Sequence, residues 1–583
     1  MTRSKIKAFL EKSAFTSAFF VNVLAALVLL YFYTLAFSRL LPEGINQVFT
    51  NRLNLRVSLL VAVMSLVVIY SRRFIPSGPK APDAASKFGR RDLLLLLLPM
   101  TPVARYIILN LGILPLLQIL ALVLVFLALG LVLSFLVPLA LRFTGSARIL
   151  SMTGLAFSFV LYSMASLAAD LKWHGFGSLF TQLAALAVVL TVLLVLDSVD
   201  RRFLRMAVSL FFAVGIATAL AAAERETSLR PRPLIAEMLE SRPPTIRPDI
   251  FLLVYDSYLG NETMLAHGID NSMQEAFLVG KGFRLYRGIW SVGRSTIASM
   301  GAMLGISRSI ASGREATSGN GTVQCILRDS GYETQGVFST DYLLRGVEPS
   351  YDRCFPAPSQ VTPSHILLAR QILEGEFRFD AGFDQIAYAD YLSEKRQALA
   401  AKGDRPVFLY AHSTLPGHSQ KSGRCLGNEV NVYLKGLAMA NEEMREDIET
   451  VVRQNPDALV IVCGDHGPYL TKTCYSSPCN DYTLGEIDRL DIQDRHGAFL
   501  AIRWPEHARV DHDSIGILQD VFPAVFAWMY DEPFALGARI ERLTGGDDMC
   551  GARVKDGIIE GGMDDGEPLF ESSTTPPAVP SAD

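Results

Sequence analysis

The stretch "DALVIVCGDHGPYL", Asp457–Leu470, decides how the second half of the chain folds. A run of apolar β-forming residues ends in Asp465, His466 and Gly467, and a proline follows at once. A short apolar run closed by Gly and Pro predicts a buried strand. Two interpretations fit: the strand ends in an ordinary polar turn, or Asp465 and His466 are two ligands of one metal ion. The rest of the sequence has to separate them.

Similar β-rich runs recur after residue 248, and they also end in polar residues: 249–257, 334–340, 405–413, 457–466 and 497–504. Helical patterns separate them, such as 433–453 with its face of Glu and Arg side chains. Buried strands that alternate with helices predict an α/β/α sandwich. In open α/β sheets, ligands bind beyond the carboxyl ends of the strands. The runs would bring Asp256, His412 and the pair Asp465–His466 to that edge.

The first 223 residues predict a polytopic α-helical membrane domain. The chain has 583 residues, 50% of them hydrophobic, and the apolar excess lies before about residue 224. A spanning helix needs about 20 mostly apolar residues. About seven segments qualify: 15–37, 55–71, 92–110, 115–140, 149–169, 176–196 and 203–223.

The segment 92–110 decides the number of crossings. Asp92 is a plausible N-cap, but Pro99, Pro102 and Arg105 make the segment a poor span, and it could instead lie in the interface or re-enter. If it spans, the basic N-terminus and the basic loops all lie inside, in agreement with the positive-inside rule. Everything after residue 224 then lies outside.

The remaining segments complete the expected organisation. Residues 224–248 are charged and proline-rich, with one amphipathic patch, and predict a juxtamembrane linker along the membrane surface. Residues 249–545 would form the outer globular domain, and the acidic Ser/Thr/Pro-rich end, 546–583, a disordered tail. The net charge of −4 gives no global basic field, so nucleic acid is not an expected partner.

The cysteines support an oxidising compartment for the outer domain. All seven lie after residue 320, which favours disulfides there. Cys463 lies inside a predicted strand and is expected to be buried and free. The position of the others along the chain predicts three pairs: Cys325–Cys354, Cys474–Cys479 and Cys425–Cys550.

Asp256, Asp465 and His466 offer oxygen and nitrogen ligands, which suit one divalent metal, zinc or else manganese, rather than calcium. A hydroxyl from "SVGRSTIASMGAML", Ser291–Leu304, could complete the set. It would open an apolar helix, where free backbone N–H groups favour a bound phosphate. A metal-bound alcohol loses its proton more easily and becomes a nucleophile. The alternative is a plain Ser or Thr helix cap.

Four ordered motifs, "LLVYDS", "RSTIAS", "AHSTLPGH" and "CGDHG", follow the predicted membrane domain. Together they resemble the alkaline phosphatase and sulfatase superfamily. More closely, the chain resembles its membrane-anchored branch that transfers phospholipid head groups, which includes lipid A phosphoethanolamine transferases, lipoteichoic acid synthases and phosphoglycerol transferases. The resemblance implies an alkaline-phosphatase-like outer domain.

The resemblance also implies roles for the ligand set. Asp256 would be the carboxylate ligand of the first strand, where the phosphoethanolamine branch usually has Glu. Asp465 and His466 would be the Asp-His ligand pair. Thr296 fits the nucleophile of the pattern S-T-x-x-S and would also contact the metal, with Ser295 as the competing choice.

A second group of residues would contact the substrate. His418 fits the histidine that contacts the transferred phosphate or protonates the leaving oxygen. His412 is the second choice for this substrate role, and its alternative role is to orient the site. Ser299 follows the nucleophile, and Arg345 could reach a phosphate. The branch usually carries another histidine about a dozen residues after the Asp-His pair. None stands there in this chain, and His496 could substitute.

Two further departures concern the head group and the reaction. Cysteines that bracket the nucleophile in many relatives are absent here. The C/S-x-P-x-R context of true sulfatases is also absent, which argues against desulfation as the reaction of this chain.

The expected function is a transferase in the bacterial inner membrane, with its catalytic domain in the periplasm. It would take a phosphoethanolamine or phosphoglycerol group from a phospholipid donor, through a phosphothreonine, to an envelope glycan or lipid acceptor. The alternatives are a hydrolase with the same site and a non-catalytic binding module.

Overall fold

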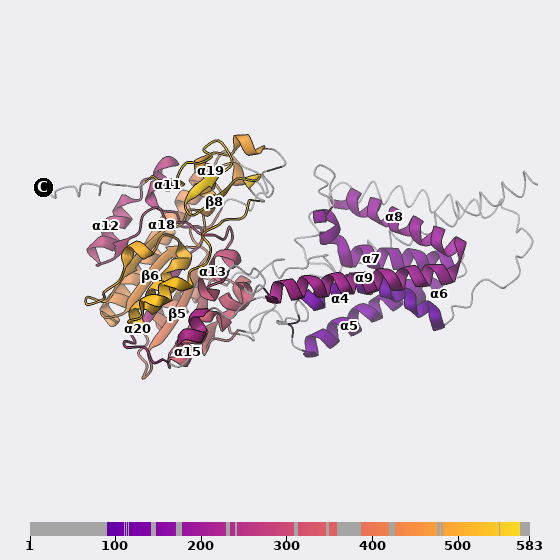
Figure 1. The fold of residues 1–583 in the computed structure, drawn as a ribbon, viewed down its shortest axis with the longest axis horizontal. Coiled ribbons are helices and arrows are strands. Elements are labelled where there is room, and N and C mark those ends of the chain that lie inside the picture. The colour runs from indigo at the N-terminus through magenta and orange to yellow at the C-terminus, as the bar shows by residue number, and fades with distance from the viewer. Residues whose placement is uncertain are drawn as a thin grey trace, which may run out of the picture. The chain divides into compact units, whose positions relative to one another are not determined.

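The computed structural model describes residues 90–109, 111, 114, 116–140, 147–170, 178–228, 234–239, 242–307, 313–344, 349–357, 386–418, 426–474, 479, 482–546 and 549–571. These residues fall into two compact units, one up to Glu224 and one from Arg225 onward (Figure 1). The division lies one residue from the predicted boundary at 223. The predicted spans 15–37 and 55–71 lie outside the described residues.

The first unit is helical throughout its described part. Its helices are η1 Arg90–Leu96, α4 Leu97–Leu109, α5 Leu116–Leu131, η2 Val132–Leu136, α6 Val137–Ala140, α7 Ala147–Asp170, α8 Ser178–Val199 and α9 Arg201–Ser228. Among the described residues, two stretches are long and apolar enough to cross a membrane, Leu116–Leu139 and Arg201–Ala221. The apolar parts of α7 and α8, Leu150–Ser163 and Ala185–Asp197, are shorter. The count of seven spans stays a prediction.

The role predicted for Asp92 is wrong. It lies inside η1 rather than at a helix start. Its buried carboxylate forms ion pairs with Arg201 Nε and Arg205, each at 3.1 Å. A carboxylate removed from water needs such partners, and two guanidinium groups supply them. Asp92 therefore ties η1 to the start of α9.

The second unit contains a seven-stranded sheet. Its strands are β1 Ile250–Tyr255, β2 Arg284–Leu285, β3 Glu333–Phe338, β4 Arg353–Phe355, β5 Val407–Ser413, β6 Leu459–Gly464 and β7 Leu500–Arg503, in the order β2-β7-β6-β1-β5-β3-β4. β7 runs antiparallel to both of its neighbours, and the other described pairs are parallel. Each of the five predicted runs overlaps one of these strands, and β3 begins one residue before its predicted run. The two that were not predicted, β2 and β4, are only two and three residues long.

Helices cover both faces of this sheet (Figure 1). Alternate residues of β1 divide between two apolar cores, because successive side chains of a strand point to opposite faces. One core contains helices α13 Thr296–Gly305, α15 Thr322–Asp329 and α20 Val521–Tyr530; the other contains α12 Ser272–Gly280, α17 Tyr388–Ala400 and α18 Glu429–Gln454. The predicted α/β/α sandwich is confirmed.

Shorter elements connect these layers. They are α10 Leu234–Leu239, α11 Asn261–Ala266, α14 Gly313–Glu315, η4 Ala316–Asn320, η5 Tyr342–Leu344, η8 Lys472–Cys474, η10 Leu484–Glu486, α19 Arg489–His496, η11 His512–Ser514, η12 Leu518–Asp520, η13 Pro533–Ala538, β8 Arg553–Lys555 and β9 Ile558–Glu560.

Two segment predictions need correction. The amphipathic patch of the linker forms α10, whose Ile235 and Leu239 are buried in the same apolar core as α15 and α20. Its apolar side therefore packs against the C-terminal domain rather than along a membrane surface. The disordered tail predicted from residue 546 is wrong over 549–571. There β8 and β9 form an antiparallel hairpin, and Val554 and Ile559 are buried.

The three predicted disulfides are also wrong. Cys479 pairs with Cys550, 71 residues away, because the C-terminal hairpin folds back onto the loop after β6. Cys474 is disulfide-bonded as well, but not to Cys479. Cys325 and Cys354 are free thiols. The prediction for Cys463 is confirmed, since this residue is buried and free in β6.

Candidate active site

Strand register brings the candidate ligands to one edge of the sheet. Tyr255, the last residue of β1, pairs with Ser413 of β5 on one side and with Gly464 of β6 on the other. Asp256 and Asp465 are the next residues along β1 and β6 and therefore follow the same row. His412 lies two rows before Asp256, opposite Val254.

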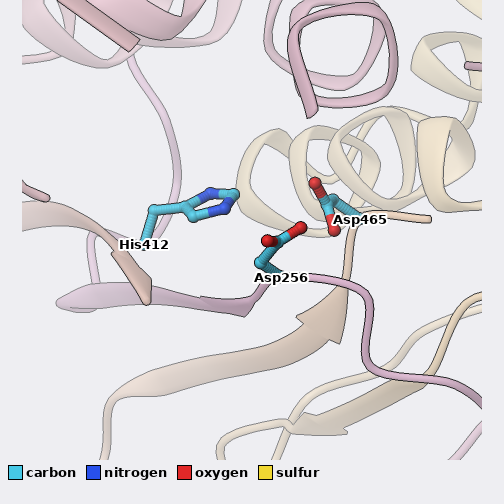
Figure 2. Close-up of side chains that lie close together, drawn as sticks. All are labelled: Asp256, His412 and Asp465. Carbon is cyan, nitrogen blue, oxygen red and sulfur yellow. The ribbon is translucent and has the colours of Figure 1, made fainter. Parts of the chain in front are cut away.

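Three of these side chains converge on a common space (Figure 2). One ligand atom from each of Asp256, His412 and Asp465 lies within 4.8 Å of the others. His466 adjoins them, with its Nε2 3.3 Å from Asp465 Oδ2 and 3.7 Å from Asp256 Oδ1. The predicted ligands therefore meet. The structure adds His412 to this group, whereas the sequence predicted a substrate-binding role for it.

Thr296 reaches the same cluster from a different loop. It is the first residue of α13, and its Oγ1 lies 3.4 Å from His466 Nε2. Ser295 is the extended N-cap residue just before it. The loop needs glycine at position 293, because a Cβ there would lie 2.2 Å from the Ser299 nitrogen. This tight turn presents the Thr296 hydroxyl among the free N–H groups of a helix start.

The protonation states suit a divalent cation. Burial lowers the pKa of His412 to about 4 and also lowers the pKa of His466. Burial alone would raise the pKa of Asp465, but His466 and His412 outweigh it and the pKa is lowered. Near neutral pH the two imidazoles are therefore neutral and Asp465 is ionised, the forms in which these groups bind metals. Mixed oxygen and nitrogen donors of this kind fit zinc.

Hydrogen bonds hold both imidazoles in fixed orientations. His466 Nδ1 lies 2.9 Å from the Gly467 carbonyl oxygen, which can only accept, so Nδ1 carries the proton and Nε2 faces the carboxylates. His412 Nδ1 lies 2.9 Å from the hydroxyl of Tyr410, two residues earlier on the same side of β5. Such partners fix which nitrogen is available to a metal.

The turn that bears Asp465 is held by residues whose roles the sequence did not reveal. The Ser257 N–H donates to Asp465 Oδ1 at 2.9 Å, and its hydroxyl donates to Asp256 Oδ1 at 3.1 Å. Ser299 is buried, and its hydroxyl donates to the Asp465 carbonyl oxygen at 2.6 Å. The "DHG" motif requires glycine at position 467, because a Cβ there would lie 1.9 Å from the Asp494 carbonyl oxygen.

His418 lies beside this cluster. Its ring centroid is 6.0 Å from that of His466 and 5.1 Å from that of Tyr469. Tyr469 stacks on His466, and the Arg495 guanidinium carbon lies 3.9 Å from the Tyr469 ring centroid. Tyr469 and Arg495 were not among the site residues predicted from the sequence. The sequence signal for them was weak: Tyr469 is an aromatic residue three positions after His466, and Arg495 is a cation next to His496.

One predicted substrate residue, His496, is not part of this cluster. His496 is 2% exposed, and its Nδ1 lies 3.1 Å from the Ser291 carbonyl oxygen. Burial, helped by Arg495, lowers the pKa of His496 to about 3, so its ring is a neutral donor to the nucleophile loop. It positions that loop rather than facing Asp256. Arg345 lies outside the described residues.

No family model matches the chain, and no curated protein is similar to it in sequence. Among solved structures, the chain is similar to the C-terminal periplasmic domain of EcEptC from Escherichia coli in complex with Zn (12% identity, TM-score 0.34, 54% of this chain and 96% of that one). It is also similar to lipooligosaccharide phosphoethanolamine transferase A from Neisseria meningitidis, an integral membrane protein (14% identity, TM-score 0.34, 75% of this chain and 95% of that one).

A third similar structure is an alkaline phosphatase superfamily protein from Vibrio parahaemolyticus (11% identity, TM-score 0.32, 51% of this chain and 74% of that one). The solved structures similar to this chain thus include members of the superfamily and of the branch that its motifs resemble.

Proposed function

We propose that this chain is a metal-dependent transferase that moves a phospholipid-derived head group, phosphoethanolamine or phosphoglycerol, through a phosphothreonine on Thr296. The acceptor is a hydroxyl of an envelope glycan or lipid. The observation that carries the proposal is the position of the Thr296 hydroxyl, 3.4 Å from His466 Nε2 at the start of α13. A nucleophile delivered to a cluster of two carboxylates and two imidazoles is the arrangement that metal-assisted transfer requires.

The residues present fit one divalent metal, zinc first and manganese second. Asp256, Asp465 and His466 would hold it together with Thr296, and His412 is placed to join them. Asp465 is fully buried near a second carboxylate, so the pair needs a positive partner. When bound, the metal supplies the positive charge that favours the ionised form of a nearby hydroxyl.

The chain's own residues account for the remaining steps. Thr296 Oγ, in its ionised alkoxide form, forms a bond to phosphorus, and the bond from phosphorus to the glycerol oxygen of the donor breaks. His418, beside His466, gives the leaving oxygen its proton. The N–H groups at the start of α13 hold the phosphate oxygens. The acceptor hydroxyl then attacks the phosphothreonine, its proton returns to His418, and Thr296 is regenerated.

A membrane anchor accounts for access to a lipid donor. We infer seven spans in a bacterial inner membrane with the C-terminal domain in the periplasm, and the two long apolar helices of the first unit support that topology. The disulfide Cys479–Cys550 supports an oxidising compartment. A hydrolase would use the same groups with water as the acceptor.

The test uses the full chain in detergent, loaded with zinc, and labelled phosphatidylethanolamine and phosphatidylglycerol. Thr296→Ala is expected to abolish diacylglycerol release while the protein still binds zinc. Thr296→Ser should keep partial activity, since a hydroxyl remains but its rotamer is less fixed. Ser295→Ala is the matched control, because it removes the neighbouring hydroxyl at the helix cap.

Mass spectrometry of the trapped enzyme should find the head group on the Thr296 peptide. Release of diacylglycerol from neither lipid would contradict the proposal. Rapid turnover of soluble phosphodiesters without an acceptor would favour the hydrolase. Loss of activity in Ser295→Ala with retention in Thr296→Ala would move the nucleophile by one residue.

A further inference from the structure

A cavity of about 360 Å³ lies beside His418, between the loop 414–418 and the first half of α18. Its described walls are Tyr388, Thr414, Leu415, Pro416, Gly417, His418, Glu429, Val432, Tyr433 and Met439. The volume lies near the lower end of ligand sites, which measure about 300–1,000 Å³. No step of the proposed reaction involves this cavity, although His418, the proposed proton donor, forms part of its wall.

The α18 wall of the cavity is a single stripe. Glu429, Val432 and Met439 stand three and seven residues apart, so they project from the same side of the helix. Gly436 continues the stripe, and a Cβ there would lie 2.2 Å from the Pro416 carbonyl oxygen. The loop that carries His418 therefore rests directly on α18, which fixes the distance between the two walls.

The chemistry of the walls suits a neutral ligand of mixed polarity. Leu415, Pro416, Val432 and Met439 give it an apolar side. Three of the polar side chains have hydrogen-bond partners within the protein. Tyr388 donates to Glu443 at 2.7 Å, and Tyr433 donates to the Ser257 carbonyl oxygen at 3.1 Å. Glu429 accepts from the Leu426 N–H at 3.1 Å. The described lining residues include no lysine or arginine, so the walls are not suited to a phosphate.

We infer that this cavity is the leaving-group subsite, which receives the glycerol and the first acyl carbons of the phospholipid donor. The inference rests on the proposed function, in which the bond from phosphorus to the glycerol oxygen breaks and that oxygen takes its proton from His418. The group that receives the proton must lie against His418. A diacylglycerol is neutral, with apolar acyl chains and polar ester groups. This mixture matches walls that combine apolar and polar side chains.

Helix α18 provides both the variants and their control. Val432, Met439 and Leu434 are all exposed apolar residues, at 56%, 47% and 39%. Val432 and Met439 line the cavity, whereas Leu434 lies two residues beyond Val432 on the opposite side of the helix. Val432→Asp and Met439→Asp place a charge where acyl carbons would lie, and Leu434→Asp adds the same charge away from the cavity.

The experiment compares two donors with zinc-loaded full-length enzyme in detergent. One is long-chain phosphatidylethanolamine, and the other is a water-soluble diester with the same head group and a nitrophenyl leaving group. Val432→Asp and Met439→Asp should raise KM for the long-chain lipid by about 10-fold or more, since small changes in an apolar pocket are worth about 10–200-fold. Their kcat/KM for the soluble diester should fall by much less than for the lipid, because its leaving group carries no acyl chains. Leu434→Asp should behave as wild type with both.

The outcomes separate the inference from the proposed function. If wild type releases no diacylglycerol from any phospholipid, the proposed function fails and the inference fails with it. If wild type is active but the cavity variants match Leu434→Asp, only the inference is overturned. The same holds if they slow both donors equally, or if they raise KM for the acceptor instead. Val432→Ser and Met439→Ser serve if an aspartate variant fails to fold, and the same donor-selective change is expected of them.

Discussion

The imidazole of His466 lies parallel to the phenol ring of Tyr469, with 4° between the planes and 5.2 Å between the centroids. Tyr469 itself is held from two directions. Its hydroxyl donates to the Arg294 carbonyl oxygen in the nucleophile loop, and Arg495 lies over its ring. The stack therefore sets the tilt of a candidate metal ligand, while the Gly467 carbonyl sets its tautomer.

Removing this ring should weaken metal binding without removing a ligand. Tyr469→Ala is expected to lower zinc affinity by about 10–100-fold, the usual effect of losing a group that orients a ligand. Tyr469→Phe keeps the stack, loses the hydrogen bond to Arg294 and should retain most of the affinity. A competitive chelator titration measures both. Equal zinc affinity in wild type and Tyr469→Ala would show that the stack does not orient His466.

His412 provides a second prediction, because its place among the carboxylates differs from the substrate role expected from sequence. His412→Ala should lower zinc content, whereas a residue that only binds substrate would change KM and leave zinc in place. Tyr410→Phe removes the hydroxyl 2.9 Å from His412 Nδ1 and should lower zinc affinity by about 10–100-fold. Metal analysis after dialysis, read beside KM for the lipid donor, decides between the roles. Full zinc content in His412→Ala would show that His412 is not a metal ligand and would support a substrate-binding role.

A third prediction concerns the buried charges behind the site. Lys395 is 1% exposed and lies 2.6 Å from Glu443 Oε1, with Asp447 as its second partner. Tyr255, the residue before Asp256, donates to Asp447 at 2.6 Å, and Ser413 donates to Glu443 at 3.0 Å. Lys395→Ala would leave two buried carboxylates without their cation and should cost about 3–5 kcal/mol.

The neighbouring pair Arg396–Glu446 is exposed and provides the control, since Arg396→Ala should change stability by about 0–1 kcal/mol. The variant Lys395→Met with Glu443→Gln and Asp447→Asn removes all three charges and should recover part of the loss. Urea unfolding followed by tryptophan fluorescence suits this test, because three of the four tryptophans (290, 504 and 528) lie in the C-terminal domain. A cost below that of Arg396→Ala would contradict the prediction.

The fourth prediction is a loss of stability in acid caused by His496. Its pKa falls from 6.5 to about 3 on folding, first because it is buried. Below pH 6.5 the unfolded chain binds a proton that the folded chain excludes, so stability falls as the pH falls from about 6.5 towards 3. Each pH unit in this window costs up to about 1.4 kcal/mol.

His496→Asn can still donate to the Ser291 carbonyl but does not titrate. The variant should be less stable at pH 7 and should lose less stability on acidification. Unfolding free energies measured from pH 7 to pH 4 give both slopes. An unchanged slope in the variant would mean that other groups cause the acid sensitivity.

The sequence was sufficient where the signal was local. The runs before Asp256 and Asp465 are wholly apolar, and both form strands in the centre of the sheet. His412 was harder to assign, because it stands at a strand end as a ligand would, but only six residues before His418 in "AHSTLPGH". Which of the two histidines joins the carboxylates depends on the register of β5 against β1, and no single segment contains that information.

The cysteine pairs and the tail failed for a related reason. Proximity along the chain favoured Cys474–Cys479, whereas the observed Cys479–Cys550 bond closes over 71 residues. The composition of 546–583 is that of a disordered segment, yet Val554, Ile559 and Leu569 are buried beside Trp290. A few apolar residues spaced along a glycine-rich segment are enough to fold it when a preformed surface is available, and composition averages do not show that.

The position of β1 has a consequence for how the protein is made. It is the first strand of the sheet in sequence, yet it pairs with β5 on one side and β6 on the other, so Ile250 lies opposite Phe408 and Leu459. During synthesis both edges of this wholly apolar strand stay unpaired until β5 and β6 have been made, when most of the domain is complete. Pairings over such sequence separations form slowly. Asp256 and Asp465 meet only when β6 docks. A nascent chain therefore needs protection from aggregation throughout that interval, and the candidate metal site is complete only after β6 has joined the sheet.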